Sequence, residues 1–187
     1  MVKLLGRVLL AGSLAMLSVP ASAQRKTVPS GTMAHRHEFG VDLQASYLKP
    51  SGGSGGIVLG LPVDVRIALL THKKLMFEPR LSLAFNSAGT TTYVISPGLN
   101  VLYQRTRGSG PYNLMHAPYL TGGVALTLFD FGAPSGTQLS LNGVVGKRVP
   151  YGDAAARFEG FFRYAFKGGD AVSSFAIGAR IGLSFWH

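Results

Sequence analysis

The last fifteen residues of the chain, SSFAIGARIGLSFWH, alternate strictly between apolar and small or polar side chains. Because successive side chains of a strand point to opposite sides, Ile177, Ile181, Leu183 and Phe185 share one apolar face. The opposite face carries Gly, Ser, Ala and a single charged residue, Arg180. A strand of this kind separates two different media. The fold therefore depends on which medium the apolar face meets.

Seven earlier segments have the same period of two, and no helical periodicity competes with it after the N-terminal region. They are residues 37–48, 56–69, 75–86, 91–103, 118–129, 137–149 and 154–166. Stretches rich in Gly, Pro, Asn, Asp and Ser separate them, and these residue types reverse the chain. An even number of strands of about ten residues, joined by turns, is typical of transmembrane barrels. The sequence predicts an all-β fold, an eight-stranded antiparallel up-and-down transmembrane β-barrel.

The face opposite the apolar one carries the charges that decide the orientation. They are Glu38, Asp42, Asp64, Arg66, Glu78, Arg80, Arg157, Glu159, Arg163 and Arg180. Facing lipid, each arginine would cost up to about 2–4 kcal/mol, and five of them would outweigh the stability of many domains. The sequence therefore predicts that these residues face the lumen as an ion network. We expect the network to plug the barrel; a narrow pore with a slight anion preference is the alternative.

The composition agrees with this orientation. Only 14% of the residues are charged, against about 25% in a typical soluble domain. The chain therefore has too few charged side chains to cover the surface of a soluble barrel. A soluble periplasmic lipid-binding barrel with the apolar face inside remains an alternative, although its interior would be overfilled. The formal charge of +10 favours anionic lipid or lipopolysaccharide as a partner. Scattered cations in an exported chain argue against nucleic acid.

The first 23 residues have the pattern of a secretory signal peptide. Lys3 and Arg7 precede an apolar run from Val8 to Val19, and an A-x-A site ends at Ala23. The predicted organisation is a signal peptide over residues 1–23, a periplasmic segment over 24–36 and the barrel over 37–187. The chain contains no cysteine, so the fold uses no disulfide.

The whole exported chain resembles the small outer-membrane barrels of the OmpA transmembrane domain and OmpX group. In that group the last strand is apolar at every second position and ends on an aromatic residue, which the barrel-assembly machinery reads. Phe175, Ile177, Ile181, Leu183 and Phe185 fit this pattern. The last position departs from it, because His187 stands where the family has Phe; Trp186 precedes it, so the signal is weakened and not absent. The resemblance implies the outer membrane of a Gram-negative bacterium, with a structural or interaction role and no cofactor. It leaves the oligomeric state open.

Other candidate sites are weaker. His35, His37 and His187 are expected at the periplasmic rim, where a metal site is a hypothesis and simple interfacial placement is favoured. Acyl-transfer chemistry would need a serine with a histidine at the outer rim, and no H-x-S pair exists, so we predict no enzyme.

The sequence also makes predictions about three prolines and a set of aromatic residues. Pro62, Pro79 and Pro97 fall inside predicted strands, where bulges or strand ends are expected. Aromatic girdles at the membrane interfaces are expected from residues near the segment ends. These are Tyr47, Tyr93, Tyr103, Phe129, Tyr151, Phe166 and Trp186. The long connection over residues 104–117 falls on the periplasmic side, although long loops are external in the family, so one strand is a candidate for misplacement.

Overall fold

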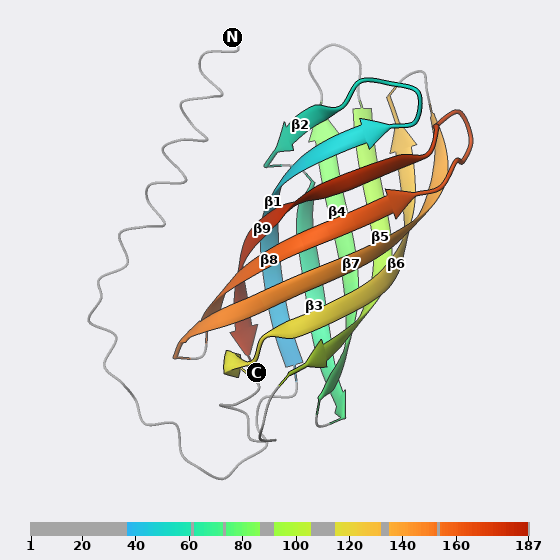
Figure 1. Cartoon of the computed structure of the whole chain (residues 1–187). Coiled ribbons are helices and arrows are strands. Elements are labelled where there is room, and N and C mark those ends of the chain that lie inside the picture. The colour runs from blue at the N-terminus through green and yellow to red at the C-terminus, as the bar shows by residue number, and fades with distance from the viewer. Residues whose placement is uncertain are drawn as a thin grey trace.

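The alternating segments pair into one antiparallel sheet that closes on itself (Figure 1). The computed structural model describes residues 37–60, 62–72, 74–86, 92–105, 115–131, 135–152 and 154–186. Its strands are β1 (His37–Pro50), β2 (Gly56–Leu59), β3 (Val63–His72), β4 (Leu75–Asn86), β5 (Thr92–Gln104), β6 (Tyr119–Asp130), β7 (Ser135–Tyr151), β8 (Ala154–Ala165) and β9 (Ser174–Trp186). The predicted signal peptide and periplasmic segment lie outside the described residues.

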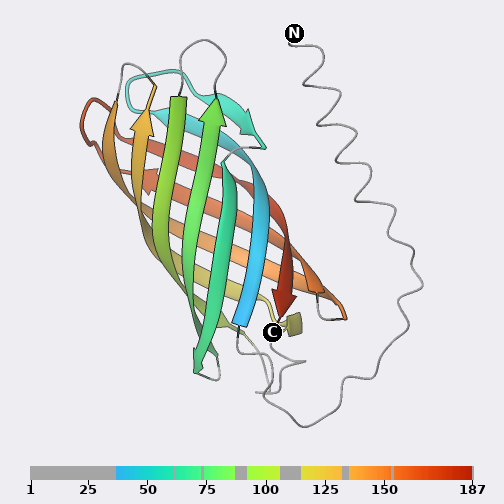
Figure 2. The same cartoon turned by 180° about the vertical axis from the view of Figure 1, so that it is seen from behind.

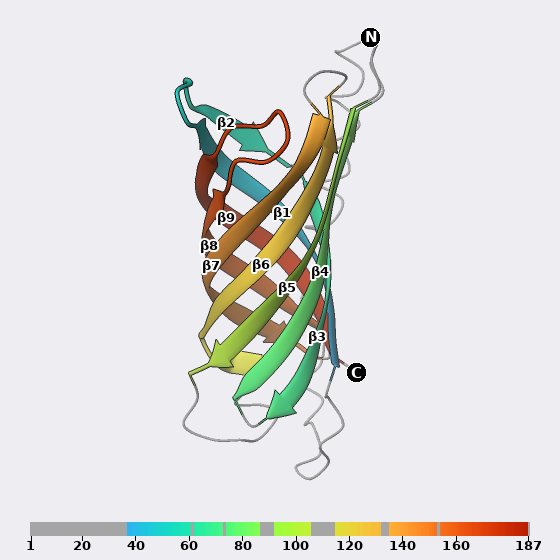
Figure 3. The same cartoon turned by 90° about the vertical axis from the view of Figure 1, so that its right-hand side faces the viewer.

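Closure of the barrel comes from the first and last strands. β1 pairs with β9 continuously from Glu38 opposite Trp186 to Pro50 opposite Ser174. Each remaining strand pairs with its neighbours in sequence, so the wall is an up-and-down barrel with strongly tilted strands (Figure 3). β2 and β3 pair with successive halves of β1 and together occupy one position in the wall. The barrel therefore has eight positions, as the sequence predicts.

The prolines act in two different ways. Pro62 lies at the interruption between β2 and β3, which confirms a strand end within the predicted segment 56–69. At Pro79 and Pro97 the expectation of bulges or strand ends is wrong, because both residues remain inside strands without a shift of register. Instead, the ladder skips two rungs on one side of each proline: β3–β4 at Pro79 and β5–β6 at Pro97. A missing N–H therefore weakens one ladder and leaves the other intact.

The apolar face is on the outside. On β9, Ile181 is 55% exposed and Phe185 51%, whereas Arg180 is 3% exposed and Ser184 is fully buried. The same division holds around the wall, so the orientation predicted for a transmembrane barrel is the one that the structure has. Among the described residues, no helix is long and apolar enough to span a membrane.

Two of the aromatic residues expected in the girdles are inside the barrel. Phe129 is 6% exposed and Trp186 5%, because each has the same parity as the inward-facing residues of its strand. Tyr47, Tyr93, Tyr103, Tyr151 and Phe166 are exposed, as expected. The girdle prediction is therefore wrong at Phe129 and Trp186.

The two ends of the barrel differ. The terminal end, where β1 begins and β9 finishes, is also where β5 ends and β6 begins (Figure 2). No described strand is misplaced, because all eight positions of the wall are filled in sequence order. Met115, shortly before β6, packs with Met76, Leu102, Tyr119 and Trp186 in a buried cluster. Towards the far end of the barrel, where β1 finishes and β9 begins, a smaller buried cluster consists of Val144, Phe161 and Ala176.

Candidate functional site: the barrel lumen

The inner face of the wall brings together charged side chains from six strands. β1 provides Glu38 and Asp42, β3 Asp64 and Arg66, β4 Glu78 and Arg80, β7 Arg148, β8 Arg157, Glu159 and Arg163, and β9 Arg180. Period-two alternation explains why residues so far apart in sequence share one interior. All are buried except Arg163, which is half-buried. Such a set is tolerated inside a protein only when the charges are paired.

Glu38 is the hub at the terminal end. Its carboxylate accepts hydrogen bonds from Arg66 Nη1 at 2.9 Å, from Arg148 Nη2 at 2.6 Å and from Ser184 Oγ at 2.6 Å. Arg157 Nη1 lies 3.5 Å from the same carboxylate. One acid thus interacts with three guanidinium groups from β3, β7 and β8.

Arg66 connects the hub to the middle of the lumen. Its Nε donates to Asp42 Oδ2 at 2.8 Å, and its Nη2 donates to Ser184 Oγ at 2.9 Å. Arg80 then bridges Asp42 and Asp64, with Nη2 at 3.4 and 2.9 Å from their carboxylates. The chain of ion pairs therefore crosses β1, β3 and β4 without interruption.

A second branch passes through Arg157. Its Nη1 donates to Glu78 Oε2 at 2.7 Å and its Nε to Glu159 Oε1 at 2.6 Å. Glu159 also accepts from Tyr119 Oη at 2.8 Å and from Arg180 Nη1 at 3.3 Å. Both branches meet at Glu38 through Arg157, so the pairs form one connected network across the lumen.

Arg148 belongs to this network and is missing from the sequence prediction. It is fully buried, and its guanidinium lies over the rings of Tyr119 at 4.5 Å and Trp186 at 5.2 Å while it pairs with Glu38. The parity of β7 could have identified it, because Leu139, Leu141 and Val145 face outward and Arg148 has the opposite parity.

Glycines provide the space that these side chains need. A Cβ atom added to Gly40 would collide with the guanidinium of Arg66, and one added to Gly146 would collide with the ring of Tyr119. Both glycines lie on the inner face of the wall. The lumen is narrow enough that a long charged or aromatic side chain on one strand requires a missing side chain on its neighbour.

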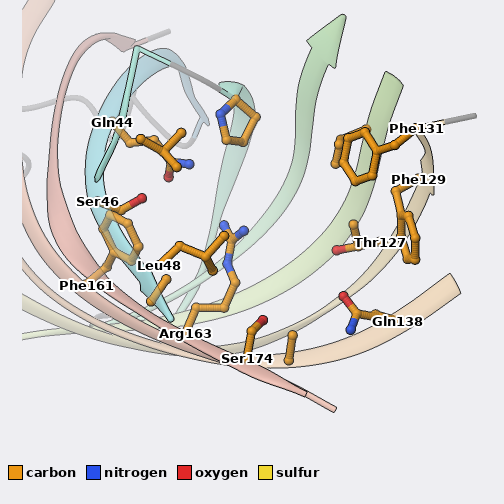
Figure 4. A pocket seen from close by; sticks show the side chains of 15 residues that line it. Gln44, Ser46, Leu48, Thr127, Phe129, Phe131, Gln138, Phe161, Arg163 and Ser174 are labelled. Atoms are coloured by element: carbon orange, nitrogen blue, oxygen red, sulfur yellow. The ribbon is translucent and has the colours of Figure 1, made fainter. Parts of the chain in front are cut away.

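Arg163 is the exception among the ten predicted residues. It faces the lumen as predicted, but it forms no ion pair within 4.0 Å with any described residue. It projects into a cavity of about 220 Å³ at the far end of the barrel (Figure 4). The other nine residues all take part in ion pairs, which are those described above.

The hypothesis of a histidine metal site at the rim stays a prediction. His37 is exposed at the start of β1, whereas His35 and His187 lie outside the described residues. No group of three His, Cys, Asp or Glu side chains that could hold a metal ion occurs in the described part of the chain.

Comparisons with known proteins support the fold. No known protein family matches the sequence, and no curated protein matches it. Among solved structures, Neisserial surface protein A (NspA) is similar with a TM-score of 0.60 and 15% identity, over 81% of this chain and 97% of that one. The N-terminal β-barrel domain of Pseudomonas aeruginosa OprF matches with a TM-score of 0.40 and 14% identity, over 78% of this chain and 97% of that domain. The likeness to NspA is one of architecture, the closed eight-stranded transmembrane barrel.

Proposed function

We propose that this chain is a non-conducting barrel of a bacterial outer membrane, with a structural or interaction role in the envelope. The observation that carries the proposal is the connected ion network around Glu38 and Arg157. Ions or solutes in transit would have to separate buried pairs, and breaking one such pair costs about 3–5 kcal/mol. The cluster of Met76, Met115 and Trp186 adds an apolar obstruction at the terminal end.

Single-channel recording in planar bilayers tests the closed lumen. Purified protein is first inserted into vesicles, and a heat-dependent shift in gel mobility establishes that the barrel is folded there. We expect no steady conductance steps from such preparations. Reproducible steps from folded protein would overturn the proposal in favour of the narrow pore.

The proposed location rests on the outward apolar face and the sequence of the first 23 residues. Cell fractionation tests it, with recovery in the outer-membrane fraction as the expected result. Recovery of a detergent-free monomer in the soluble periplasmic fraction would instead favour the lipid-binding alternative. We propose no enzymatic activity and no cofactor.

The proposed partners follow from the same surfaces. Membrane lipid and lipopolysaccharide would cover the exterior, where Lys49 and Lys167 are exposed cations at the far end. The assembly machinery would engage β9 through its alternating apolar residues. Replacing Ile181 and Phe185 by serine should lower the fraction inserted in cells, whereas replacing the inward Ala176 by serine should leave insertion unchanged. Equal insertion of the two variants would contradict recognition through the apolar face.

A further inference from the structure

The far-end cavity differs in chemistry from the ion-paired half of the lumen. Most of its wall is apolar. Phe129 and Phe131 form a stacked pair on the β6 side, with ring centroids 5.7 Å apart. Arg163 reaches in from β8 across the cavity from these rings, with Ser46 and Ser174 on neighbouring strands (Figure 4). The cavity is therefore amphipathic, with one cation facing an aromatic surface.

Arg163 has no carboxylate within 4.0 Å among the described residues, and Asp64, farther away, is the acid whose charge acts on it. Six arginines and five carboxylates line the described lumen, and every one of these arginines except Arg163 has a carboxylate within 4.0 Å. Asp64 is already held by Arg80 at 2.9 Å and by Arg180 at 3.4 Å. None of the described residues that line the cavity is an acid. Arg163 is therefore the one charged side chain among the described residues that line the cavity.

A partly buried guanidinium that forms no direct ion pair gains free energy when an anion displaces its remaining water and accepts a charge-assisted hydrogen bond. Aromatic side chains in a pocket wall stabilise a ligand whose apolar part packs against them. We infer that the cavity binds a small aromatic monocarboxylate, with the carboxylate on Arg163 and the ring against Phe129 and Phe131.

The size of the cavity limits the ligand. Its volume of about 220 Å³ is below the range of about 300–1,000 Å³ that encloses drug-sized molecules, so it admits one ring with a short acidic arm and excludes a whole lipid. On the side of the terminal end, the ion pairs of Arg180 with Glu159 and Asp64 block further passage. The cavity is thus a binding site at the far end and not a step in a transport path.

The test uses the isotope-labelled barrel in detergent micelles, titrated with 3-phenylpropanoate and, separately, with its uncharged amide. Backbone amide resonances of Ser174 and Ala176 should shift and saturate, while the indole resonance of Trp186 at the terminal end should not move. The amide should bind at least about tenfold more weakly, the loss expected when one charge-assisted contact is removed. Empty micelles provide the blank for partitioning.

Two sets of variants separate the contribution of the Arg163 charge to binding from that of the aromatic surface. Arg163→Gln should weaken carboxylate binding at least about tenfold, and Arg163→Lys should retain most of it. Arg105→Gln removes an exposed arginine at the terminal end and should change nothing. Phe131→Ala should weaken the acid and the amide alike, leaving their ratio unchanged.

Three results would overturn the inference. They are equal affinity for the acid and the amide, equal affinity of the unmodified protein and Arg163→Gln, or resonance shifts confined to lipid-facing residues. If Arg163→Gln does not fold, as judged by the heat-dependent gel shift, the ratio of acid to amide affinity in the unmodified protein decides the matter alone.

Discussion

Removing the charge of Glu38 should be among the most damaging conservative substitutions in this barrel. Glu38→Gln keeps the shape of the side chain but leaves Arg66, Arg148 and Arg157 with one carboxylate fewer. Glu38 is fully buried, so water cannot replace the lost charge. Breaking a buried ion pair in this way costs about 3–5 kcal/mol, and we expect the free energy of unfolding to fall by about that amount.

Urea unfolding of the barrel in lipid vesicles measures the effect. With a slope of about 2 kcal/mol per molar urea, the midpoint should fall by about 1.5–2.5 M. Trp186, the single tryptophan of the chain, reports locally, because its ring lies 5.2 Å from the guanidinium of Arg148. Asp170→Asn, at an exposed position outside the named strands, is the matched control and should leave the midpoint unchanged.

A double variant sharpens the interpretation. Glu38→Gln with Arg148→Gln removes both partners of the 2.6 Å ion pair, so its cost should be smaller than the sum of the two single costs by about 0.5–3 kcal/mol. A fall in the midpoint equivalent to less than about 1 kcal/mol for Glu38→Gln, or strict additivity in the double variant, would refute the view that Glu38 is the hub.

Three further predictions test other parts of the wall. Gly40→Ala should lower the free energy of unfolding by about 1–3 kcal/mol, because its Cβ would displace the Arg66 guanidinium; Gly122→Ala, where a Cβ meets nothing, is the control in the same unfolding assay. Ile181→Arg on the exposed face of β9 should cost up to about 2–4 kcal/mol in lipid, and a neutral result in vesicles would contradict the outward orientation. Pro97→Val should restore an N–H opposite the gap in the β5–β6 ladder and slow hydrogen exchange there; unchanged exchange would mean that the proline does not cause the gap.

Local alternation was enough to predict much of the fold. On β9, Ile181 and Leu183 lie on the face opposite Arg180. This alternation predicted both the strand and its orientation, because a guanidinium that faces lipid destabilises the barrel. The same argument placed the acids and arginines in one interior. The split at Pro62 was predictable in kind, since proline cannot donate to a ladder.

Three features could not be predicted from the sequence, because they depend on distances between strands. Nothing in the sequence near Met115 indicates that it packs on Met76 and Trp186. Arg163 looks like the other lumenal arginines in the sequence, and its lack of an ion pair reflects the particular positions of Asp64 and Arg180. Arg148 could have been found by parity, but its contact with the Tyr119 ring could not.

The seam between β1 and β9 has a consequence for biogenesis. Ser184 donates to Glu38 across 146 positions of sequence, and Arg180 donates to Gln44 across 136. Neither contact exists until the final strand has paired with the first. In a sheet that has not yet closed, guanidinium and carboxylate groups of the lumen would lack partners. Because unpaired charges in hydrocarbon are costly, the ion pairs that stabilise the closed barrel would also disfavour an open intermediate.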